Sequence, residues 1–162
     1  MGSEMCIRDR LIVFISTSNS LSHSAGSPPG YTGSPGDDLN TCVSCHGVSS
    51  TESLMPYSLS LFSDIGEYYI PGDLYYFTID VSGVGIDEFG FQTCFENEEG
   101  EKVGEIILAD SIQTQLISSG NYITHTSYGV NGLNSKSWNF YWKAPLTVQG
   151  QISVYTLSLI HI

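Results

Sequence analysis

One short segment, Leu74-Tyr75-Tyr76-Phe77-Thr78-Ile79-Asp80-Val81, constrains the fold of this chain most strongly. It alternates apolar with more polar side chains and is rich in aromatic and β-branched residues, which is the pattern of a half-buried strand. A second segment, 136–143, places Trp138, Phe140 and Trp142 on one face of a strand and so predicts a core. These two segments indicate a protein built from β-sheets.

The other predicted strands are short and are separated by turn residues. They cover 57–61, 90–95, 103–108, 112–117 and 121–126, with a last one beginning near Ile152. Pro71 and Gly72 predict a turn before the strand at 74–81, and no segment shows a convincing helical period. The pattern therefore predicts an all-β fold, an antiparallel Ig-like β-sandwich over residues 54–156.

Both ends of the chain have the mark of a DNA adaptor. A DNA string that encodes Met5-Cys6-Ile7-Arg8-Asp9-Arg10 has a reverse complement that encodes Leu-Ser-Leu-Ile-His and then Ile or Met, and residues 157–162 are Leu-Ser-Leu-Ile-His-Ile. We therefore interpret residues 1–10 and 157–162 as translated sequencing adaptor and set them apart from site reasoning. We expect the native protein to be longer at both ends.

Charge and leader composition predict the compartment. The net charge is −12, and without residues 1–10 the only basic side chains are three lysines, so we expect neither nucleic acid nor an anionic membrane surface as a partner. The apolar run 11–15, followed by small polar residues to Ala25, resembles the end of a signal peptide (11–25) cleaved near Ser24 or Ala25. No other segment approaches membrane-spanning length, and we expect a secreted, cell-surface or periplasmic protein.

Residues 26–53 form the predicted N-terminal loop. The stretch GSPPGYTGSPGDDLNT at 26–41 carries turn residues throughout and predicts an extended surface loop without regular elements. Asp37, Asp38 and Asn40 could bind calcium, but a solvated turn is the stronger interpretation, as it is for the acidic run from Glu96 to Glu101. Cys94 is expected to face away from the core as a free thiol.

The loop then reaches Cys42-Val43-Ser44-Cys45-His46, the signature of covalent haem c attachment. Two thiols at this spacing form thioethers with one haem, and the adjacent histidine becomes the proximal iron ligand. Two alternatives stay open. Cys42 and Cys45 could close a small disulfide in an oxidising compartment, or a zinc ion could be held by four of Cys42, Cys45, His46, Cys94 and His125.

Several motifs together resemble a known domain. The strings SPPGYTGSPGD, TCVSCHG, PGDLYYFTIDVS, GFQTCF, YITHTS and SWNFYWKAP occur in the order found in the Reeler-like domain called choice-of-anchor V, which is frequent in Bacteroidetes-type secreted surface proteins. The resemblance covers roughly residues 26–156. It implies a β-sandwich, export, and anchoring or sorting through a C-terminal region beyond this sequence, but it implies no established activity.

The sixth iron ligand is the last predicted site residue. His125 and Met55 are the candidates, because haem sites of this type recruit His or Met. The resemblance pairs a histidine in THTS with the CxxCH motif and therefore favours His125 as the distal ligand. We find no catalytic constellation and expect no enzyme. The expected function is an exported haem c module that transfers electrons or senses redox state with an external redox partner; the alternative is a structural or adhesive surface module without haem.

Overall fold

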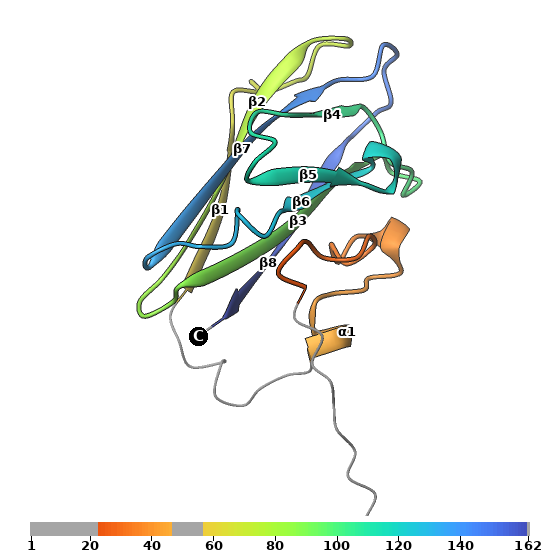
Figure 1. Cartoon of the computed structure of the whole chain (residues 1–162). Helices are drawn as coiled ribbons and strands as arrows, with labels where there is room; N and C mark the ends of the chain where they lie inside the picture. The colour runs from red at the N-terminus through yellow and green to blue at the C-terminus, as the bar shows by residue number, and fades with distance from the viewer. Residues whose placement is uncertain (1–22, 47–56, 162) are drawn as a thin grey trace, which may run out of the picture.

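The computed structural model describes residues 23–46 and 57–161, excluding the side chains of Cys45, His46 and His161. Two four-stranded antiparallel sheets pack face to face, with strand orders β1-β2-β7-β4 and β5-β6-β3-β8 (Figure 1). The strands are β1 (Tyr57–Ser63), β2 (Leu74–Gly83), β3 (Glu88–Glu96), β4 (Glu105–Leu108), β5 (Thr114–Ile117), β6 (Tyr122–His125), β7 (Ser135–Lys143) and β8 (Ser153–His161). The predicted all-β sandwich is confirmed.

Alternation along the strands fills the space between the sheets. Phe77, Ile79 and Val81 of β2 and Trp138, Phe140 and Trp142 of β7 are all buried, and they meet the inward face of β3. Phe95 stacks on Trp142 with ring centroids 4.7 Å apart, and Phe77 stacks on Phe140 at 5.4 Å. Offset aromatic stacking of this kind adds to the energy of apolar burial. The core predicted from β7 is confirmed.

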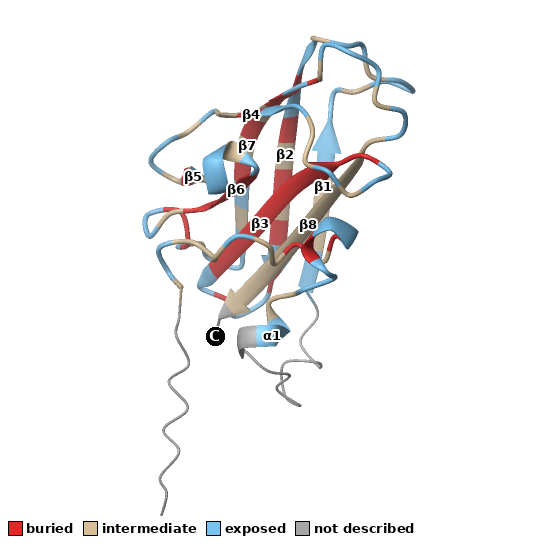
Figure 2. Ribbon diagram, turned by 90° about the vertical axis from the view of Figure 1, so that its right-hand side faces the viewer, coloured by how far each residue is buried: buried red, intermediate tan, exposed pale blue. Residues whose placement is uncertain are grey.

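The outer face of β3 is also buried, because the N-terminal segment covers it. Every residue of β3 after Glu88 is buried, as Figure 2 shows. A strand with only one covered face would alternate between buried and exposed positions. The covering segment, residues 23–46, lies along the β3 side of the sandwich (Figure 1). It contains a 3₁₀ turn, η1 (Pro35–Asp37), and one helical turn, α1 (Val43–His46). The expectation that residues 26–41 hold no regular element was wrong, because η1 lies within them.

Strand β8 continues through the residues that we interpreted as adaptor. It runs from Ser153 to His161 and pairs with β3 along its length, from Glu96↔Ser153 to Glu88↔His161. The adaptor interpretation of residues 157–162 and the signal peptide at 11–25 stay predictions. Among the described residues, no helix is long and apolar enough to cross a membrane.

Candidate functional site

Gln92 is the main polar anchor between β3 and the N-terminal segment. Its amide nitrogen donates to Ser27 Oγ and to the Pro28 carbonyl, both at 2.6 Å, and its Oε1 accepts from the Tyr31 N–H at 2.8 Å. The side chain is almost completely buried, so each of these bonds avoids the cost of an unsatisfied polar group. Gln92 thus fixes the first part of the segment on the sheet.

His125 lies at the end of β6, beneath the start of the same segment, and is 6% exposed. Its Nδ1 accepts a hydrogen bond from the Phe91 N–H at 3.1 Å, and the Phe91 carbonyl lies 3.3 Å from the same atom. Its Nε2 lies 3.2 Å from the His23 carbonyl. A carbonyl only accepts, so this arrangement assigns the ring proton to Nε2.

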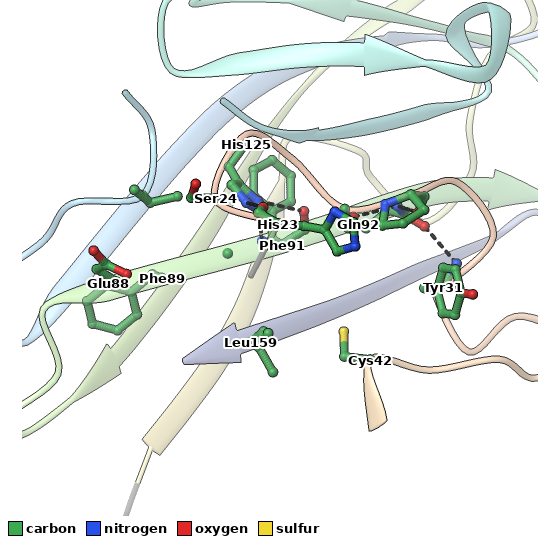
Figure 3. Close-up of a pocket in the computed structure, with 14 residues that line it drawn as sticks. His23, Ser24, Tyr31, Cys42, Glu88, Phe89, Phe91, Gln92, His125 and Leu159 are labelled. Atoms are coloured by element: carbon green, nitrogen blue, oxygen red, sulfur yellow. Dashed lines mark hydrogen bonds between the residues drawn. The ribbon is translucent and has the colours of Figure 1, made fainter. Parts of the chain in front are cut away.

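A small apolar pocket brings His125 and Cys42 to one place. The sheet contributes His125, Phe91 and Gln92 to its lining. The N-terminal segment contributes Cys42, the residue directly before α1 (Figure 3). We call it the Cys42–His125 pocket. Its volume is about 50 Å³, far below the roughly 300–1,000 Å³ of sites that enclose a small molecule. The pocket is therefore too small to enclose a ligand of that size.

The structure describes Cys42, Val43 and Ser44 of the CxxCH motif in full, and Cys45 and His46 by their backbone alone. Cys42 immediately precedes α1, and the Ser44 N–H donates to the Thr41 carbonyl at 3.0 Å to open the turn. The side chains of Cys45 and His46, and all of Met55, lie outside the described residues.

A buried ion cluster, which sequence reasoning did not find, holds the second part of the segment. The Lys102 ammonium pairs with Asp37 Oδ1 at 2.8 Å and with Glu96 Oε1. Tyr122 and Thr32 donate to the two Asp37 oxygens at 2.5 and 2.6 Å. Three elements far apart in the sequence, η1, β3 and β6, are joined through this cluster.

The charges in this cluster stabilise one another. Burial by itself raises the pKa of Asp37, but the Lys102 ammonium and hydrogen bonds from Thr32 and Tyr122 outweigh it and hold that pKa below its usual value. Burial likewise opposes the charge on Lys102, yet Asp37 and Glu96 keep the pKa of the ammonium above its usual range. Burial and the bond to Asp37 raise the pKa of Tyr122 to about 12. At neutral pH Asp37 and Lys102 are therefore charged, and Tyr122 is the neutral donor.

The cluster corrects two predictions. Asp37 and Glu96, expected in solvated turns, are 7% and 1% exposed. The turn after β3 returns the chain so that Lys102 bridges to Glu96 across it, which supplies the counter-charge that the acidic run lacks locally. The Asp37 carboxylate is paired with Lys102 and is not the solvated turn charge that the sequence indicated.

Cys94 belongs to this cluster and not to the Cys42–His125 pocket. It faces away from the core as expected, but the segment covers it completely, with Thr32 Oγ1 at 3.3 Å from its sulfur. Asp37, Cys94 and Glu96 are the one group of metal-ligating side chains that lie close together within the described ranges. The Lys102 ammonium pairs with both carboxylates of this group. Cys94 lies beside Thr32 and Glu96 and does not line the Cys42–His125 pocket, so a zinc site there would need the other four candidates, Cys42, Cys45, His46 and His125.

Comparisons with known proteins add one likeness. No protein-family model and no curated protein matches the chain. The chain is similar to the crystal structure of the Reelin-N domain of F-spondin, with 22% sequence identity and a TM-score of 0.46, over 62% of this chain and 69% of that one. The sandwich assignment above depends on the strand pairing and not on this likeness.

Proposed function

We propose that this chain is an exported haem c module that transfers electrons or senses redox state at the cell surface or in the periplasm. The observation that carries the proposal is the position of Cys42. The first cysteine of a Cys-x-x-Cys-His motif lies on the same apolar pocket as a buried histidine from β6. The resemblance to Reeler-like surface domains, made on sequence motifs, supports the same compartment.

The N-terminal segment would supply the covalent bonds and the proximal ligand, and the sheet would supply most of the apolar contacts. Cys42 and Cys45 would form the thioethers, and His46 would be the proximal ligand, as the motif requires. The apolar lining, which includes Phe89, Phe91 and Val130, would contact the edge of the macrocycle. A haem bound there would supply one-electron chemistry. Peroxidase-type catalysis needs an open sixth position on iron, and a bound His125 would close it.

His125 can serve as distal ligand only if His23 moves. The His23 carbonyl now accepts from Nε2, the nitrogen nearest the N-terminal segment. Cleavage of the leader near Ser24 or Ala25 would remove His23 and release Nε2. The other nitrogen, Nδ1, would then carry the proton, and it would exchange the bond that it accepts from the Phe91 N–H for one donated to the Phe91 carbonyl, 3.3 Å away. A backbone carbonyl commonly orients metal-bound histidines in this way.

Covalent haem is the direct test of the proposal. After periplasmic expression with the haem-attachment machinery, we expect a denaturing gel to show one haem-stained band, which is lost or strongly reduced in Cys42→Ala and Cys45→Ala. Cys94→Ala is the matched control, because Cys94 lies in the ion cluster, and its band should keep full intensity. A folded, colourless wild-type protein would overturn the proposal.

The distal ligand has its own test. In the haem-loaded, leader-cleaved protein, we expect His125→Ala to convert the six-coordinate low-spin ferric spectrum to a high-spin one, since an axial ligand is lost. Met55→Leu should leave the spectrum unchanged. The opposite result, a change with Met55→Leu and none with His125→Ala, would assign the sixth position to Met55.

A second candidate is a structural or adhesive surface module without haem. The ion cluster favours it, because Lys102, Asp37 and Glu96 fasten the N-terminal segment without any metal. Cys42 and Cys45 would then close a disulfide or hold zinc. In that case the purified protein would stay colourless, and reduction or chelation would alter the motif without loss of the sandwich.

A further inference from the structure

A second cavity lies at the opposite end of β3 from the Cys42–His125 pocket. Glu88 to Gln92 of β3 line that pocket, whereas Phe95, near the end of the strand, lines the cavity. The cavity has a volume of about 550 Å³, within the range of sites that bind small molecules. The loop between β1 and β2 forms one wall, and the loop between β7 and β8 forms the other. We call it the Tyr68–Trp142 cavity.

The walls of this cavity are apolar and well supported. Phe95 and Trp142 belong to the buried core, and Ile65, Tyr69 and Ile152 pack against it. Tyr69 meets Trp142 edge to face at 6.1 Å, and its hydroxyl accepts from the Gln149 N–H at 2.9 Å. These contacts join the two loops. The cavity is thus held open by packed aromatic side chains.

The charge at the rim restricts the ligand. Glu67 is the one charged residue among the described lining residues, and it is exposed, with Gln151 as a neutral neighbour. No described lysine lines the cavity, and the chain carries a net charge of −12. An anionic head would therefore meet only repulsion, whereas a cationic or neutral head would not.

We propose that the Tyr68–Trp142 cavity binds a single amphiphile, whose hydrocarbon body enters between the two loops and whose head carries no negative charge. Tyr68, which is 78% exposed, covers the body at the mouth, and Glu67 faces the head. This site is independent of the haem motif and uses none of residues 157–162.

Nile red and three twelve-carbon competitors test the proposal on the full chain. We expect saturable Nile red fluorescence that dodecanol and dodecyltrimethylammonium, below their micelle concentrations, displace about tenfold more effectively than dodecanoate. Glu67→Lys should reverse the order of the two charged competitors. Tyr68→Ala should weaken Nile red binding, whereas Tyr128→Ala, a tyrosine that is 76% exposed and outside the cavity lining, should not.

Three results would overturn the proposal. They are the absence of saturable Nile red binding, equal binding by Tyr68→Ala and Tyr128→Ala, and dodecanoate competing as well as dodecyltrimethylammonium with the wild-type chain. Both tyrosines are highly exposed, so both variants are expected to fold, which circular dichroism would verify.

Discussion

Replacing Lys102 with methionine is expected to lower the free energy of unfolding by about 3–5 kcal/mol, because two buried carboxylates lose their counter-charge. Lys102 pairs with both Asp37 and Glu96, and methionine keeps most of the stem volume while removing the charge. Denaturant unfolding at pH 7 measures the loss. Lys143→Met is the matched control, since Lys143 is exposed, and it should change the value by no more than about 0.5 kcal/mol.

A double variant separates charge from packing. Adding Glu96→Gln to Lys102→Met removes one unpaired buried carboxylate and should recover part of the lost stability. If the double variant is less stable than Lys102→Met alone, Lys102 acts through its aliphatic stem and the charge explanation is wrong.

The pH dependence of wild-type stability has a definite sign. The pKa of Asp37 is lowered in the fold from its ordinary value of 3.8, so its contribution is fully present above that value and is lost as the pH falls through the folded pKa. Lys102→Met removes the ammonium that helps to lower this pKa. The free energy of unfolding of the Lys102→Met variant should therefore depend less steeply on pH in that acidic range than that of the wild type.

The second large effect is expected from Gly36→Ala. A Cβ on Gly36 would overlap the Gly100 carbonyl oxygen and would lie 2.6 Å from Glu96 Oε1. A backbone carbonyl cannot rotate away, so η1 must lift from the turn after β3. We expect the free energy of unfolding to fall by an amount near the upper end of the roughly 1–3 kcal/mol that overpacking costs.

Cys94 reports whether the segment has lifted. In the wild type it is 0% exposed and burial raises its pKa to about 11, so alkylation at pH 8 followed by peptide mapping should leave it unmodified. Gly36→Ala should expose it to the reagent. Gly66→Ala is the control, because a Cβ there meets nothing within 4 Å. Equal protection of Cys94 in both variants would show that the segment stays in place.

Strand positions were predictable because their signal is local. Alternation at period 2 requires only neighbouring residues, and it correctly placed β2, β3 and β7 and the inward face of Trp138, Phe140 and Trp142. The strand order was not predictable in this way. β7 lies between β2 and β4, a pairing that depends on long-range contacts.

The candidate site was predictable only in its chemical part. The spacing of Cys42, Cys45 and His46 identifies haem attachment as the leading hypothesis, and the sequence alone suggested His125. The hydrogen bond between His125 and the His23 carbonyl joins residues 102 positions apart. No local pattern encodes such a contact.

The sequence by itself therefore determined the β-class and the core face of its strongest strands, because each depends on neighbouring residues; haem attachment at the CxxCH motif stays a prediction. Only the tertiary structure decided that the N-terminal segment covers β3 and that Asp37 and Glu96 are buried charges. Solvated and buried acidic turns have the same composition, and the difference is made by one lysine, which lies 65 positions from Asp37 along the chain and 2.8 Å from it in the fold.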